Sequence, residues 1–142
     1  MYEDYTRQAL PSRRYRELLG TALCVFNANN QFVIENILRV GGVSETWATL
    51  FNPSPDNSDG LQLNIKRTIT KHSNRKIGAL FGEIVAVRNR IVHSVQITEN
   101  DEQILRSVDK KGIQFTITEG FLIKFIQENE KLALLLHDFR GY

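Results

Sequence analysis

Apolar side chains recur along much of the chain at steps of three and four residues, the period of an amphipathic helix. The longest such series lies in the first third of the sequence and consists of Leu19, Leu23, Phe26, Val33, Ile37 and Val40. Asn30 alone interrupts it. Ser12 is a suitable N-cap, and Gly41-Gly42 is a suitable stop. The pattern therefore predicts one long helix over residues 12–40.

Two shorter helical segments are expected next. One begins at Ser44 as its N-cap and runs to Phe51. The other covers residues 61–71, where an apolar stripe recurs every turn. The members of this stripe are Leu61, Ile65 and Ile69. The segment NPSPDNSDG (52–60) lies between them and contains two of the three prolines, so it indicates a loop.

A fourth helix is expected after the hydrophilic segment 72–74, ending near Ser94. Its stripe is Ile77, Phe81, Ile84, Arg88 and Ile91. At 100° per residue, Arg88 lies at the centre of the apolar face, Asn89 and His93 lie on its flank, and Arg90 points to the opposite side. A cation therefore occupies a position where a core leucine is expected.

The last third of the chain predicts a small β-hairpin followed by a helix. Ile113, Phe115 and Ile117 alternate with polar residues after the turn 109–112, which indicates two short strands. A loop is expected over 98–101. Thr118 is the N-cap of the final helix, whose apolar face is Phe121, Phe125, Leu132, Leu135 and Phe139. The fold class expected is all-α, a bundle of four or five helices with the hairpin inserted before the last helix.

Length and composition are those of one ordinary folded domain over residues 1–142. Hydrophobic residues make up 42% and charged residues 24%, and the net charge of +2 means that nucleic-acid affinity would require local clusters of cations. The one cysteine, Cys24, excludes an intrachain disulfide, and its apolar neighbours predict a buried thiol. His72 and His137 have no acid or cysteine at metal-ligand spacing, so neither a metal nor a cofactor is expected.

The N-terminal segment MYEDYTRQAL does not resemble a signal peptide. The longest apolar run, Leu132–Leu136, is far shorter than the roughly 20 residues of a membrane helix. We therefore expect a cytoplasmic protein without a membrane partner.

Arg88 allows two explanations. A guanidinium on an apolar stripe is unfavourable unless it is paired, reaches solvent or lines a wet cleft. It is either a structural arginine, extended to solvent or paired with a buried acid, or part of a functional site. The neighbours Asn89 and His93 favour a functional site. Phosphodiester cleavage requires a fixed positive charge, which Arg88 supplies, and a group of the kind that can exchange a proton near neutral pH, which histidine is.

At these residues, RNRIVH, the sequence resembles the HEPN superfamily, whose mark is an R-x4-6-H motif with a polar residue after the arginine. In that family the motif lies near the end of a late helix of an α-helical bundle, and the architectural resemblance spans residues 12–139. It implies a metal-independent endoribonuclease that acts as a homodimer, with both motifs facing a shared cleft.

The resemblance also implies residue roles. Arg88 binds the scissile phosphate, His93 moves the proton between the ribose 2′-hydroxyl and the leaving 5′-oxygen, and Asn89 positions His93 or the phosphate. The product carries a 2′,3′-cyclic phosphate. The implied biological role is that of a toxin or an abortive-infection effector of antiviral defence, with an antitoxin protein as a partner.

One departure limits the resemblance. Toxin members that are paired with a nucleotidyltransferase antitoxin often carry H-x-Y, whereas Val95 stands two residues after His93 here. A non-catalytic HEPN-like module that binds RNA or a protein is therefore kept as the alternative. A purely structural or oligomerisation module is the third hypothesis, and it predicts that Arg88 pairs with an acid.

Two cation clusters are candidate RNA contacts. Residues 66–76 carry five cations and no acid, and we assign RNA binding to Lys71, Arg75 and Lys76. A solvated helix face explains the same residues. Arg13, Arg14 and Arg16 form the second cluster, at the start of the first helix.

Overall fold

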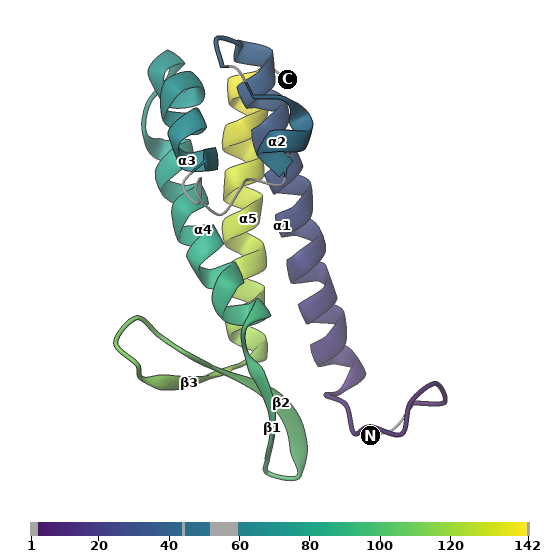
Figure 1. The fold of residues 1–142 in the computed structure, drawn as a ribbon. Coiled ribbons are helices and arrows are strands. Elements are labelled where there is room, and N and C mark those ends of the chain that lie inside the picture. The colour runs from purple at the N-terminus through teal and green to yellow at the C-terminus, as the bar shows by residue number, and fades with distance from the viewer. Residues whose placement is uncertain (1–2, 44, 52–59, 142) are drawn as a thin grey trace.

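Three long helices lie side by side and form the body of the protein (Figure 1). The computed structural model describes residues 3–43, 45–51 and 60–141. The long helices are α1 (Arg13–Val40), α4 (Lys76–Val92) and α5 (Glu119–Arg140). Helix α5 packs against both α1 and α4 and lies between them in Figure 1.

The ends of the long helices follow the local signals in the sequence. The Ser12 hydroxyl accepts a hydrogen bond from the Tyr15 amide at 3.1 Å, and the Thr118 hydroxyl accepts one from the Phe121 amide at 3.1 Å. Helix α1 ends before Gly41, whose φ of 81° is readily adopted only by glycine. The predicted bounds of the first helix and the predicted start of the last helix are thus confirmed.

The buried faces are broader than the predicted stripes. The core residues of α1 and α5 include Leu18, Ala22, Leu122 and Leu136, which the predicted stripes omit. The predicted residues Leu19, Leu23, Val40, Phe121, Leu135 and Phe139 are only half-buried. A helix with two helical neighbours buries more than one narrow stripe, and α5 has α1 on one side and α4 on the other.

Buried asparagines join α1 to α5. Asn29 is buried at this level of α1, whereas Asn30, which lies on the predicted apolar stripe, is only half-buried. Its Nδ2 donates to the main-chain oxygen of Asn129 at 2.8 Å and lies 3.0 Å from Asn129 Oδ1. Asn129 Nδ2 in turn donates to the Phe125 carbonyl at 3.0 Å. The pair is therefore hydrogen-bonded, as buried amides need to be.

Between α1 and α4, the residues that the structure describes form short and irregular helical elements. These are α2 (Trp47–Phe51), α3 (Gly60–Ile65) and the π-helical turn η2 (Lys66–Thr70). The continuous α-helix expected over 61–71 therefore changes type midway. The expected cap Ser44 and the loop residues 52–59 lie outside the described residues.

A three-stranded antiparallel sheet precedes α5, where only a two-stranded hairpin was expected. The fold is therefore a helical bundle with a small sheet and is not strictly all-α. Its strands are β1 (Val95–Glu99), β2 (Glu102–Val108) and β3 (Gln114–Ile117), in the order β1-β2-β3. The additional strand β1 begins two residues after His93, and its Val95 pairs with Arg106 of β2. Residues 98–101, expected as a loop, contain the end of β1 and the turn to β2.

Tyr15 of α1 connects the sheet to the helical bundle through two hydrogen bonds. Its hydroxyl donates to the Ile117 carbonyl and accepts a hydrogen bond from the Leu105 amide at 3.3 Å. Burial raises the pKa of the Tyr15 phenol, and the bond from Leu105 opposes this.

Among the described helices, none has the length and apolar character needed to cross a membrane.

Candidate functional site

The three residues of the R-N-x-x-x-H motif lie at the C-terminal end of α4. Val92 is the last helical residue, and His93 is the C-cap, with its amide donating to the Asn89 carbonyl at 3.0 Å. The Ser94 hydroxyl donates to the Ile91 carbonyl at 2.6 Å, and the chain then enters β1 directly. The imidazole is exposed and sits at the junction of helix and sheet.

Arg88 is half-buried and turned towards α1. Its Cζ lies 5.3 Å from the centre of the Phe26 ring, and its Nη1 donates to Asn89 Oδ1 at 3.0 Å. Phe26 is buried and stacks on Phe81 of α4, with ring centres 6.3 Å apart. Among the described residues, Arg88 has no acidic partner within ion-pair distance. The pairing with a buried acid that the structural module requires is therefore not found in that part of the chain.

A groove between the end of α4 and strand β2 contains the other two motif residues. Its volume is about 410 Å³. It is lined by Ala86, Asn89, Arg90, His93, Val95, Arg106, Ser107 and Val108. Several of these side chains are exposed, so the groove is open to solvent. We call it the His93 groove.

The structure brings Asn89 and His93 together, and it places Arg88 outside the groove. The reason is the helical rotation: Asn89 and His93 lie about 100° and 140° round the helix from Arg88. Asn89 is the link between the two sides, because it lines the groove while its Oδ1 accepts the hydrogen bond from Arg88.

Two arginines of the groove were not predicted. Arg90 was expected on the side of the helix opposite Arg88, and the groove lies on that side because β2 packs against this end of α4. The Ser107 hydroxyl donates to the Arg90 carbonyl at 2.9 Å and holds β2 there. Arg106 reaches the groove from β2. A cation in the middle of a strand was its only signal in the sequence.

The basic segment 66–76 lies at the other end of α4. Lys71, Arg75 and Lys76 are exposed and precede or begin the helix, whereas His93 follows it. Helix α4 has 17 residues, a length of roughly 25 Å at 1.5 Å per residue, and Lys76 is its first residue while His93 directly follows its last. The predicted RNA contacts and the His93 groove are therefore not adjacent.

The arginines of the second cluster are already paired with acidic residues. Arg13 Nε and Arg16 Nη2 lie 3.0 Å and 2.6 Å from Glu3 Oε1, and Arg14 Nε lies 3.6 Å from Glu119 Oε1. These hydrogen bonds from Arg13 and Arg16 lower the pKa of Glu3 from 4.5 to about 2. The pKa of Arg13 is raised, chiefly by its hydrogen bond to Glu3. An RNA strand would have to displace the two acids.

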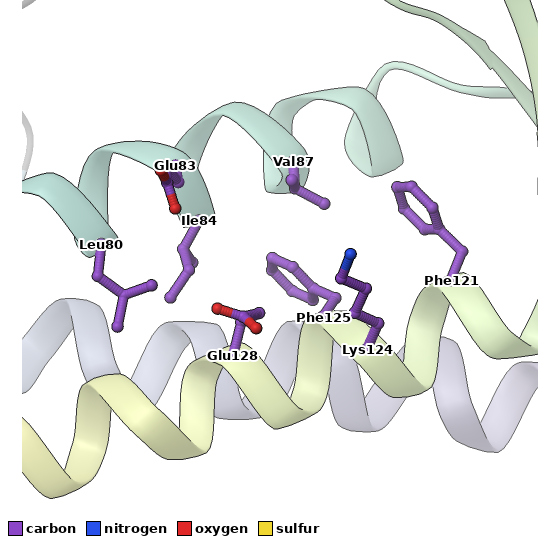
Figure 2. Close-up of a pocket in the computed structure, with 8 residues that line it drawn as sticks. All are labelled: Leu80, Glu83, Ile84, Val87, Phe121, Lys124, Phe125 and Glu128. Atoms are coloured by element: carbon purple, nitrogen blue, oxygen red, sulfur yellow. The ribbon is translucent and has the colours of Figure 1, made fainter.

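A second groove of about 370 Å³ lies between α4 and α5 (Figure 2). Leu80 and Val87 of α4 face Phe121 and Phe125 of α5 across it. Its charged lining residues are Glu83, Lys124 and Glu128. Glu128 is bound to Lys131 at 3.1 Å. This groove holds none of the motif residues, so it is separate from the candidate site.

Cys24 is exposed, so the buried thiol that its apolar neighbours predicted is wrong. The reason is its place on the outer side of α1, two residues from each of the buried Ala22 and Phe26. Within residues 3–43, 45–51 and 60–141, no three His, Cys, Asp or Glu side chains are grouped so that they could hold a metal ion.

Comparison with known proteins gives no relative for this chain. No protein-family model, curated protein or solved structure matches it.

Proposed function

We propose that this protein is a metal-independent endoribonuclease whose site is formed by Arg88, Asn89 and His93. The observation that supports it is the position of His93, an exposed imidazole in an open groove that is also lined by Asn89 and two arginines. An imidazole can move protons at neutral pH, and guanidinium groups stabilise the charge that develops on a phosphorane.

The reaction is an attack of the ribose 2′-oxygen on the adjacent phosphorus. His93 takes the 2′-hydroxyl proton as a base and, as an acid, delivers a proton to the leaving 5′-oxygen, so that no net proton is gained or lost. The new O2′–P bond forms as the P–O5′ bond breaks, which leaves a 2′,3′-cyclic phosphate and a 5′-hydroxyl. Arg88 stabilises the phosphorane, and Asn89, already hydrogen-bonded to Arg88, positions the phosphate or His93.

The proposal includes a homodimer with a shared cleft. Arg88 lies outside the groove that holds His93 of the same chain, so a second copy is one way to complete the site. Three valines around this end of α4 are exposed, namely Val92 (45%), Val95 (61%) and Val108 (49%). Exposed apolar side chains that gather in one place are typical of a surface that another protein covers.

The test is an RNase assay on purified full-length protein in excess chelator, with analysis of the product ends. Wild type is expected to give 2′,3′-cyclic phosphate ends, and His93→Ala should be folded and inactive. His137→Ala is the matched control, because His137 is an exposed histidine of α5 outside the groove, and it should cleave like wild type. Absence of cleavage by the wild-type dimer would reject the proposal.

A non-catalytic RNA- or protein-binding module is the second candidate function. It is favoured by the engagement of Arg88, which is held by the Phe26 ring and by Asn89 instead of pointing into the His93 groove. This candidate predicts salt-dependent RNA binding without cleavage, unchanged in His93→Ala.

A further inference from the structure

Arg106 has donor groups that the protein does not use. Its Nη2 lies 3.5 Å from Glu99 Oε1, the limit of a hydrogen bond, and both side chains are more than a third exposed. A contact of that length between exposed groups contributes little. Its Nε is buried and has no hydrogen-bond partner. A buried donor without an acceptor is unfavourable, so this guanidinium is suited to an additional acceptor.

Arg90 is the second cation of the groove. It is half-buried, and it forms no ion pair with any of the described residues. Its backbone carbonyl accepts a hydrogen bond from the Ser107 hydroxyl, so the last turn of α4 and strand β2 are held together beside the groove that both arginines line. This contrasts with Arg13, Arg14 and Arg16, each of which has an acid within 3.6 Å.

The remaining chemistry of the groove suits an anion with an oxygen-rich head. No acidic residue lines it, and Asn89 and His93 add polar groups beside the arginines. A guanidinium presents its donors in a planar fork that matches two oxygens of a phosphate. Because the groove is open and its rim carries the exposed Val95 and Val108, it can admit a chain that continues on either side of the bound phosphate.

We infer that Arg90 and Arg106 form a phosphate-binding site in the His93 groove that receives a backbone phosphate of single-stranded RNA. The inference rests on the proposed function for the identity of the ligand. It adds two substrate-binding residues, from α4 and β2, on the side of the helix away from Arg88. The strand is thereby held at a phosphate next to His93 by residues outside the R-N-x-x-x-H motif.

The test measures binding separately from cleavage. The probe is a fluorescein-labelled single-stranded RNA with 2′-O-methyl groups on every ribose, which has no free 2′-hydroxyl to attack the phosphate. Arg106→Gln and Arg90→Gln are each expected to weaken binding by the full-length protein about tenfold, the loss of one charged hydrogen bond. Each should also lower the slope of log K against log salt by about 0.7. Arg106→Lys should keep the slope and recover only part of the affinity.

Arg140→Gln is the control with the same change of charge. Arg140 ends α5 at the end of the bundle away from the sheet (Figure 1), and this variant should bind like wild type. Circular dichroism and thermal unfolding check the fold of every variant, and Arg90→Gln carries the test if Arg106→Gln does not fold. The inference is overturned if both groove variants bind like wild type, or if Arg140→Gln loses as much affinity.

Two further arms separate the alternatives. In the first, a mononucleotide or inorganic phosphate competes with the RNA. If it displaces the RNA at an equal concentration of phosphate groups, the site binds a small phosphate or phosphate ester, and the inference that its ligand is single-stranded RNA is rejected. If wild type binds the methylated RNA with the expected losses in the variants but cleaves no unmodified RNA, the nuclease proposal alone fails. If wild type cleaves RNA and both groove variants cleave it with unchanged KM, the inference alone fails.

Discussion

Asn29 of α1 and Asn129 of α5 form a buried hydrogen-bonded pair, with Asn29 Nδ2 2.8 Å from the Asn129 carbonyl oxygen and 3.0 Å from its Oδ1. Asn29→Ala should lower the free energy of unfolding by about 1–3 kcal/mol, because two buried acceptors of Asn129 lose this donor. Chemical denaturation measures it. Asn27→Ala is the control, since Asn27 is exposed on the same helix, and it should change stability by less than about 0.5 kcal/mol. Equal losses in the two variants would contradict the role of the pair.

Glu3 makes the attachment of the N-terminal segment sensitive to acid. Its pKa is about 2 in the folded protein, because Arg13 and Arg16 hydrogen-bond its carboxylate, and 4.5 without them. Since the folded value is lower, the stability that Glu3 contributes is present above pH 4.5 and disappears as the pH falls towards 2. The difference in unfolding free energy between wild type and Glu3→Gln should therefore vanish over this range. The pKa of the Glu3 carboxyl, measured by NMR titration, should rise towards 4.5 when Arg13 and Arg16 are both changed to Gln. An unchanged pKa would refute the assignment.

Tyr15 gives the opposite dependence at alkaline pH. Burial raises the pKa of its phenol above 10.0, so the unfolded chain loses this proton first as the pH rises. The stability that Tyr15 contributes is thus complete below pH 10 and declines above it. Tyr15→Phe should lower the unfolding free energy by about 1–2 kcal/mol near neutrality, since the Ile117 carbonyl and the Leu105 amide lose their partner. A decline above pH 10 that is as steep in Tyr15→Phe as in wild type would argue against Tyr15 as its source.

Arg88→Met separates the proposed catalytic role of this arginine from its packing against Phe26. Methionine keeps an apolar stem over Phe26 and removes the charge, so the loss of stability should be about 1 kcal/mol or less, the value of a partly exposed cation–π contact. The rate of RNA cleavage should fall by roughly 10²–10³, as expected when a group that stabilises the transition state is removed. Thermal unfolding and initial cleavage rates measure the two effects. A variant with normal cleavage would remove Arg88 from the proposed site.

Val95→Asp tests the proposed dimer surface. Light scattering of wild type at micromolar concentration should give twice the mass of one chain, and a charge at this exposed valine should give a monomer. Leu134→Asp is the control, because Leu134 of α5 is 58% exposed, close to the 61% of Val95. It should remain dimeric. A monomeric wild type would count against the shared cleft, and a dimeric Val95→Asp would place the interface elsewhere.

The parts of the fold that depend on local signals were predictable. Ser12 and Thr118 mark helix starts through hydrogen bonds that span only three residues, and both predicted caps are confirmed. The rotation of a helix is harder to predict. Asn29 and Asn30 differ by about 100°, and packing against α5 decides which of them is buried.

The composition of the His93 groove could not be predicted in full. Asn89 and His93 share one helix, so their proximity follows from helical spacing. Arg106 joins them only because β1 exists and pairs Val95 with Arg106. Five residues with mostly exposed side chains give a weak strand signal, and the register of a strand pair is a long-range property.

The π-helical turn at Lys66–Thr70 has a consequence for variation in chain length. Such a turn is one residue longer than the α-helical turn it replaces, and here it buries Thr68 and Ile69, with the Thr68 hydroxyl donating to the Asn64 carbonyl at 2.6 Å. Deleting one residue from it would restore ordinary helical spacing and turn everything before it by about 100° relative to α4. Ile65, buried now, would be carried towards solvent. Length changes in this short stretch should therefore be tolerated far less well than the same changes in an exposed loop.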